Sequence, residues 1–138
     1  MPTTAPEGYL VVAVGIAADA SGRLLVGQRP QGKDYAGQWE FPGGKLEPGE
    51  TVFSALVREF REELGLQVRV AEPLFTARHS YLDRQVELHL WLVTDFHGEA
   101  KGLEGQSLRW VAPKDLATLD FLEGNRALLE RVSALTGA

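Results

Sequence analysis

Three glutamates at helical spacing are the residues best suited to carry chemistry in this sequence. Glu59, Glu62 and Glu63 lie in the run R-E-F-R-E-E-L at residues 58–64. At about 100° per residue in a helix, Glu62 and Glu63 lie about 60° and about 40° to either side of Glu59, so the carboxylates are neighbours. Mg²⁺ binds carboxylate oxygens together with substrate phosphate oxygens. The spacing therefore predicts a metal site for a phosphate-bearing substrate, whereas a lone run of this kind is more often a solvated acidic face.

The helix predicted to carry these glutamates, residues 51–64, also has an apolar side. Glu50 lies at the positive end of its dipole, and Gly65 suits the left-handed residue just past its end. One apolar stripe, about 100° wide, can pack on a core. Its members are Phe53, Leu56, Val57, Phe60 and Leu64.

The glutamates are part of a longer pattern. Gly44 is followed after five residues by Glu50, and after seven more by R-E-F-R-E-E-L-G-L at residues 58–66. At every fixed position this pattern resembles the Nudix box. The resemblance implies the Nudix fold and a hydrolase of a nucleoside diphosphate linked to another group, working with Mg²⁺ or Mn²⁺. An accidental match in an unrelated α/β domain is the alternative, and seven fixed residues at about 7% average usage each argue against it.

Beyond the box, the chain from Val11 onward resembles MutT-type nucleoside triphosphate pyrophosphohydrolases. The resemblance implies that water attacks a phosphorus of the triphosphate, the β one, and releases the monophosphate and pyrophosphate. The matching stretches are W-E-F-P-G-G-K at residues 39–45, Gln28-Arg29, Gly98-Glu99, Glu104-Gly105-Gln106, Trp110 and Asn125.

The resemblance also implies a role for each matching residue around the metal. Glu59 is implied both as a ligand and as the general base, and Glu104 as a ligand or the alternative base from outside the box. Glu50 and Arg58 look like a buried pair that orients the helix and Glu59. The implied metal ligands are the carboxylates of Glu59, Glu62, Glu63 and Glu104 and the carbonyl of Gly43.

Four further residues are implied to bind the nucleotide. Asn125 would read the base edge, since an amide has both donors and an acceptor; the alternative is a helix N-cap. Arg29 would contact the nucleotide, although loop arginines are usually just solvated. Phe41 and Tyr81 would line the pocket, although core aromatics are commoner.

The base preference is divided between two classes. Asn125 indicates oxidised purines, so that hydrolysis of 8-oxo-dGTP would sanitise the nucleotide pool in support of DNA repair. Tyr81 replaces a phenylalanine associated with those enzymes, and residues 28–30, 36–37 and 95–98 are closer to the branch that acts on CTP or methylated dCTP. A non-catalytic nucleotide-sensing Nudix module is a further alternative. The intact glutamates argue against it, because only a cation relieves their mutual repulsion.

Composition limits the remaining classes. The 138 residues are 44% apolar and 24% charged, typical of one globular domain; residues 1–7 are predicted to form a flexible arm. The net charge of −5 favours a small nucleoside triphosphate over a nucleic-acid polymer. The sequence has no cysteine, no signal peptide pattern and no apolar run of membrane-spanning length. We expect a cytoplasmic protein, monomeric or homodimeric, with no membrane partner.

Hydrophobic periodicity predicts an α/β protein, an α/β/α sandwich around a mixed β-sheet. The first two strands, residues 9–18 and 23–28, are expected to form a hairpin. A break at Pro73 is expected to separate two later strands. The other expected elements are strands at residues 67–70, 74–81, 86–95 and 108–111 and an amphipathic helix at residues 122–135.

Overall fold

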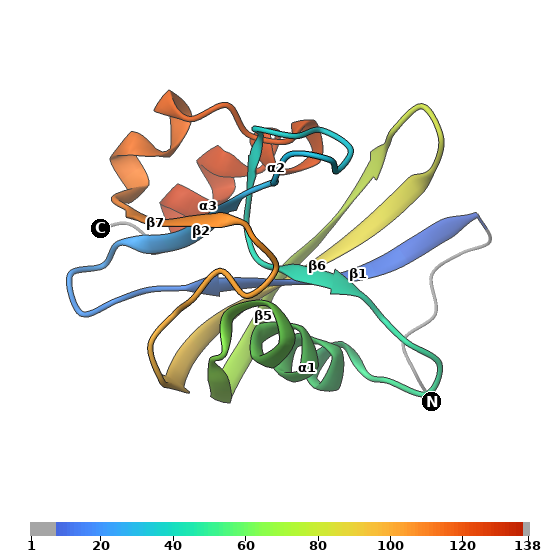
Figure 1. Cartoon of the computed structure of the whole chain (residues 1–138). Coiled ribbons are helices and arrows are strands. Elements are labelled where there is room, and N and C mark those ends of the chain that lie inside the picture. Colours follow the sequence, from blue (N-terminus) through green and yellow to red (C-terminus); the bar gives the residue numbers. More distant parts are fainter. Residues whose placement is uncertain (1–7, 137–138) are drawn as a thin grey trace.

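A mixed four-stranded sheet forms the centre of the molecule (Figure 1). The structure, a computed structural model, describes residues 8–136, so the predicted arm at residues 1–7 lies outside the described residues. The central strand β1 (Tyr9–Ala17) pairs in parallel with β6 (Gln85–His97) and antiparallel with β4 (Gly43–Lys45). This arrangement confirms the predicted mixed sheet.

The edge strand β5 (Gln67–Ser80) pairs antiparallel with β6 along its whole length. The expected separation into two strands at Pro73 is therefore wrong. Pro73 pairs with Trp91, and the register shifts between Pro73 and Phe75. A proline can be tolerated here because an edge strand has one side free of ladder bonds, and an irregularity absorbs the missing N–H.

Three strands form a second, smaller sheet. Its order is β3 (Trp39–Glu40), β2 (Leu24–Gln28), β7 (Ser107–Val111). The expected hairpin between the first two strands is wrong. Only an isolated bridge, Ala18 to Leu24, joins them across their turn, because β2 leaves the first sheet and pairs with β3 and β7.

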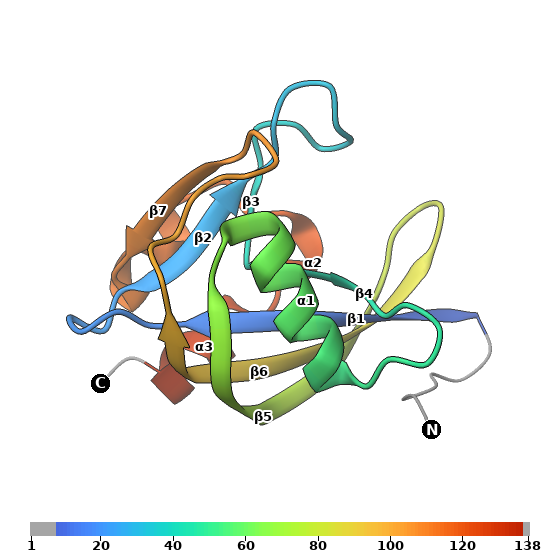
Figure 2. The same ribbon diagram turned by 60° about the horizontal axis from the view of Figure 1, so that its bottom comes forward.

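Helices cover both faces of the four-stranded sheet, as the sandwich prediction required (Figures 1 and 2). Helix α1 (Val52–Leu64) lies on one face, and η1 (Pro113–Thr118), α2 (Glu123–Arg126) and α3 (Leu129–Thr136) lie on the other. No helix in the described part of the chain is long and apolar enough to cross a membrane. The sheet therefore separates two apolar clusters, one under α1 and one under the C-terminal helices.

The C-terminal segment is two helices, not the single helix expected over residues 122–135. Two contacts attach α2 to the β3 segment: the Leu122 N–H donates to the Trp39 carbonyl at 2.8 Å, and the Phe41 N–H donates to Asn125 Oδ1 at 2.9 Å. The Leu128 N–H then bonds the carbonyl of Asn125 three residues earlier. This tighter turn interrupts the helix and lets α3 pack on the core separately.

Candidate active site

Helix α1 presents the acidic residues because its ends and its buried side are fixed locally. Thr51 is the N-cap, and Thr51 and Ser54 form a reciprocal capping box. Gly65, at φ 69°, ends the helix in the left-handed conformation expected from the sequence. The residues that bury one side of the helix are Val52, Ala55, Leu56, Phe60 and Leu64.

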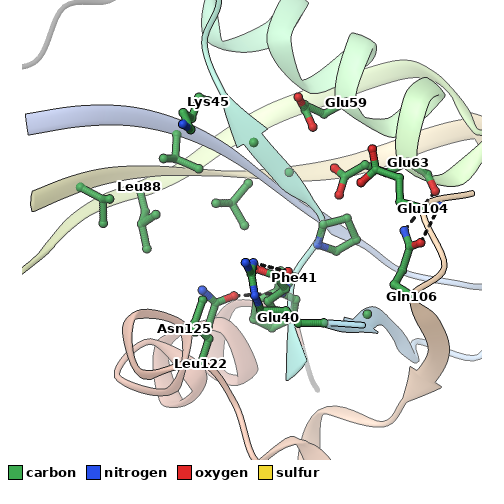
Figure 3. A pocket seen from close by; sticks show the side chains of 18 of the residues that line it. Glu40, Phe41, Lys45, Glu59, Glu63, Leu88, Glu104, Gln106, Leu122 and Asn125 are labelled. Carbon is green, nitrogen blue, oxygen red and sulfur yellow. Dashed lines mark hydrogen bonds and ion pairs between the residues drawn. The ribbon is translucent and has the colours of Figure 1, made fainter. Parts of the chain in front are cut away.

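A cavity of about 610 Å³ opens beside this helix, within the usual size of small-molecule sites. Glu59 and Glu63 from α1 and Glu104 from the loop before β7 line it. Figure 3 shows these three carboxylates at one end and the group of Phe41, Leu122 and Asn125 away from them. Residues separated by more than 60 positions thus form one site.

Gly44 allows Glu59 to approach the cavity floor. A Cβ placed on Gly44 would lie 2.5 Å from the Cδ and Oε2 atoms of Glu59. No side chain fits there without moving that carboxylate. Gly43 also lines the cavity, close against β1, where an added Cβ would lie 2.0 Å from the Ala13 carbonyl oxygen.

Arg58 is the centre of an ion-pair network next to the cavity. Its Nε lies 2.7 Å from Glu50 Oε2, and its Nη1 contacts Glu59 Oε1 and lies 3.1 Å from Glu62 Oε1. Its Nη2 donates to the Lys45 carbonyl at 2.9 Å. The Arg58 side chain is only 13% exposed, and its hydrogen bonds hold the pKa of Glu50 below its usual value. The predicted pair of Glu50 and Arg58 is therefore present and contacts Glu59.

Among the acidic residues of the cavity, Glu63 has an environment that disfavours its ionised form. Its Oε2 is buried without a hydrogen-bond partner. Burial, followed by the neighbouring carboxylates of Glu59 and Glu104, raises the pKa of Glu63 to about 9. Such a group is costly to ionise unless a cation neutralises it.

The donor set fits a divalent cation at Glu59 and Glu63. Mg²⁺ is usually bound through one or two protein carboxylates and completes its shell with phosphates and water. In the described part of the chain, no three acidic or histidine side chains converge at metal-binding distances. Glu62 does not line the cavity; its half-exposed carboxylate pairs with Arg58 instead. The buried orphan oxygen of Glu63 is the observation that favours a cation.

Asn125 marks the other part of the cavity. It is 7% exposed, and its Oδ1 accepts the buried Phe41 N–H. That contact fixes which amide atom is the oxygen and leaves Nδ2 as a donor at the cavity wall. The N-cap alternative is wrong, because Leu122 holds that position in α2. The side chains of Phe41 and Tyr81 also line the cavity, and the Gly124 N–H donates to the Tyr81 hydroxyl at 3.1 Å.

Arg29 lines the cavity but already has protein partners. Its Nε donates to the Asp34 carbonyl at 2.6 Å, and its Nη1 lies 3.2 Å from Glu40 Oε2. Burial raises the pKa of Glu40, and the positive charge of Arg29 opposes that rise. Arg29 therefore joins the loop after β2 to the half-buried carboxylate of Glu40 in β3.

Several cavity residues were not identified from the sequence. Glu40 lies within the W-E-F-P-G-G-K stretch, which could have indicated it. Lys33, Tyr35 and Arg84 come from irregular segments, whose course no periodicity predicts. The additional lining residues with polar or charged groups are Lys33, Tyr35, Glu40, Lys45, Glu47, Arg84 and Gln106.

Comparison with known proteins places this chain in a family. A family model described as the NUDIX domain matches residues 13–131. The chain is 39% identical over 129 residues to the CTP pyrophosphohydrolase of Escherichia coli K12, covering 94% of this chain and 96% of that protein. It is 33% identical over 126 residues to the 8-oxo-dGTP diphosphatase of the same organism, with 91% and 98% covered. The solution structure of the E. coli ORF135 protein superimposes with a TM-score of 0.83 at 38% identity, with 94% and 92% covered.

Proposed function

The chain belongs to the Nudix hydrolase family, and on this premise we propose that it hydrolyses nucleoside triphosphates to the monophosphate and pyrophosphate, with 8-oxo-dGTP as the leading substrate. One observation carries the proposal: a single cavity joins the carboxylates of Glu59 and Glu63 to the buried amide of Asn125. The acidic end suits a cation and the phosphates, and the amide suits a base edge.

Nudix hydrolases use divalent metal ions, and we propose Mg²⁺ or Mn²⁺ here. Glu59 and Glu63 would hold the ion, with Glu62, Glu104 and the Gly43 carbonyl as further ligands from their positions in the box and the adjoining loop. Bound there, the ion would neutralise phosphate charge and acidify water. Glu62 must leave Arg58 to join this set, since its carboxylate now pairs with the guanidinium.

The chain's own residues supply orientation and proton transfer. We assign Glu59 as the general base, with Glu104 as the alternative, because both carboxylates line the cavity. Arg58 contacts Glu59 and is itself held by Glu50, so this pair fixes the direction of the base. Water attacking the β-phosphorus would give up its proton to this carboxylate. The bond between the β-phosphorus and the bridging oxygen of the α-phosphate would break, so the nucleoside monophosphate would leave and the water oxygen would end up in pyrophosphate.

Asn125 supports an oxidised purine as the base. Its Nδ2 donor needs an acceptor on the base edge, and its Oδ1 keeps one lone pair beyond the Phe41 N–H. An oxidised guanine offers carbonyl acceptors and N–H donors to such an amide. Phe41, Tyr81 and Arg29 would complete the walls around the nucleoside.

A cytidine nucleotide, CTP or methylated dCTP, is the second candidate. The relative named CTP pyrophosphohydrolase matches 94% of this chain at 39% identity and supports this alternative. The carbonyl oxygen and the ring nitrogen of a cytosine base could equally accept a hydrogen bond from Asn125 Nδ2. We further propose that the enzyme acts in the cytoplasm on free nucleotides as a monomer or homodimer, without a nucleic-acid polymer.

A substrate comparison tests the proposal. We expect Mg²⁺-dependent release of pyrophosphate. The value of kcat/KM should be higher for 8-oxo-dGTP than for dGTP, CTP, 5-methyl-dCTP or one nucleotide sugar. Glu59→Gln should lower kcat by about 10²–10⁴, while the exposed change Glu130→Gln leaves it unchanged. Preference for a cytidine nucleotide would select the second candidate. Binding without any hydrolysis would instead favour a nucleotide sensor.

A further inference from the structure

Tyr35 has a position that the proposed roles leave unexplained. It comes from the loop between β2 and β3, lines the cavity, and is 43% exposed. Its ring centroid lies 5.9 Å from that of Tyr81. The Tyr81 hydroxyl accepts from the Gly124 N–H, next to Asn125 in α2. Through Tyr81, Tyr35 is therefore connected to the Asn125 part of the cavity.

The backbone holds Tyr35 in an unfavourable conformation. Its φ of 60° is the one positive value at a non-glycine residue in the described chain. A bulky residue seldom adopts this conformation without compensation from its surroundings. The Asp34 carbonyl accepts from Arg29 Nε at 2.6 Å, and the Tyr35 carbonyl accepts from the Gln38 N–H at 3.1 Å. These bonds fix the loop on both sides of the ring.

The ring retains a surface for a ligand. The planes of Tyr35 and Tyr81 meet at 47°, so the two rings are tilted and not stacked. With 43% of the residue exposed, the contact with Tyr81 leaves much of the Tyr35 ring uncovered. An aromatic face at a nucleotide site can stack on any base, because every base has a π-face.

We propose that Tyr35 is a specificity-determining residue that forms, with Tyr81, an aromatic wall on which the nucleobase stacks. The proposal rests on the proposed nucleotide substrate and extends it. Arg29 has a second role in it: by bonding the Asp34 carbonyl, it positions Tyr35 over the cavity. The wall would add affinity for substrates that carry a base and none for the phosphates alone.

The test compares substrates with and without a base. Tyr35→Ala and Tyr35→Gly both remove the ring, and glycine also relieves the positive φ, so agreement between them assigns the effect to the ring. We expect KM for the preferred nucleotide to rise about tenfold to a hundredfold, with kcat within about threefold. Tyr35→Phe should restore the wild-type KM. For deoxyribose 5′-triphosphate, which has no base, KM should not change.

Tyr9→Ala is the matched control, since this tyrosine does not line the cavity and packs against the Arg78 guanidinium. Isothermal titration with α,β-methylene nucleotide analogues measures affinity without turnover. Unchanged affinity in Tyr35→Ala, or an equal loss for the base-free compound, would overturn the proposal. Absence of hydrolysis by the wild type would refute the proposed reaction, while the titration would still decide the role of Tyr35.

Discussion

Replacing Glu63 by glutamine should make the metal-free protein more stable and the enzyme less active. The Glu63 carboxylate has a buried oxygen without a partner and faces Glu59 and Glu104. In the unfolded chain the same group is solvated and ionises near its usual pKa of 4.5, whereas in the folded chain its pKa is about 9. Glutamine fills a similar volume, carries no charge, and can donate its amide to Glu59.

The sign of the pH dependence follows from the raised pKa. The folded state binds the proton of Glu63 more tightly than the unfolded state, so its contribution to stability is full below pH 4.5 and is lost as the pH rises towards 9. Each pH unit in that window removes about 1.4 kcal/mol. At pH 7.5 the upper limit is therefore about 4 kcal/mol, and solvent entry and side-chain movement reduce it. We expect Glu63→Gln to gain at least about 1 kcal/mol, a stability–activity trade-off common at active sites.

Urea unfolding in EDTA, from pH 5 to pH 9, measures this effect. The difference between Glu63→Gln and the wild type should grow with pH, and Mg²⁺ should narrow it by stabilising the wild type more. Glu130→Gln, an exposed change on α3, should follow the wild-type curve. If Glu63→Gln were no more stable than the wild type at pH 8.5, the claim that the ionised Glu63 carboxylate destabilises the metal-free fold would be wrong.

Two further substitutions probe the two parts of the cavity. Gly44→Ala should place a Cβ within 2.5 Å of the Glu59 carboxylate and so displace the base, and we expect kcat to fall at least about 10²-fold, comparable with loss of the base. Because Gly44 has no positive φ, alanine should fit the backbone and the midpoint of urea unfolding should change little. Asn125→Asp keeps an acceptor for the Phe41 N–H but removes the Nδ2 donor, so we expect kcat/KM for 8-oxo-dGTP to fall about 10- to 100-fold. Because the new carboxylate lies at a position only 7% exposed, the free energy of unfolding should also fall, and more at pH 8 than at pH 5. An unaltered kcat in Gly44→Ala would contradict the close approach of Glu59 to Gly44. An unaltered kcat/KM in Asn125→Asp would contradict base recognition by the Asn125 amide.

Local signals predicted the helix and its site well. The apolar stripe and Gly65 located α1 correctly at both ends, because the bonds that end a helix lie within a few residues. The strand expected at residues 86–95 was also correct, since it lies within β6 (Gln85–His97). The resemblance assigned Glu59 and Asn125 to the same site, and in the structure both line one cavity.

The sequence did not predict which strands pair with each other or which distant segments form hydrogen bonds. The strand patterns of β1 and β2 were correct, but their pairing was wrong, because a tight turn favours a hairpin only when both strands stay in one sheet. The break after α2 was missed for a similar reason: it depends on bonds from α2 to Trp39 and Phe41, more than 80 residues away. Tyr35 had no periodicity to identify it. Long-range hydrogen bonds, more than local propensity, determined the strand pairing and the break after α2.

Two glycines show how the sheet controls the acidic site. A Cβ on Gly15 of β1 would lie 2.4 Å from the Phe60 ring, so α1 packs against β1 at a distance that only glycine permits. One residue before Phe60, Glu59 occupies the space that a side chain on Gly44 would take. Since β4 pairs with β1, both glycines belong to one rigid sheet. The close approach of the helix at Gly15 therefore fixes the depth at which Glu59 enters the cavity, and the acidic group is positioned by the core beneath it as much as by its own helix.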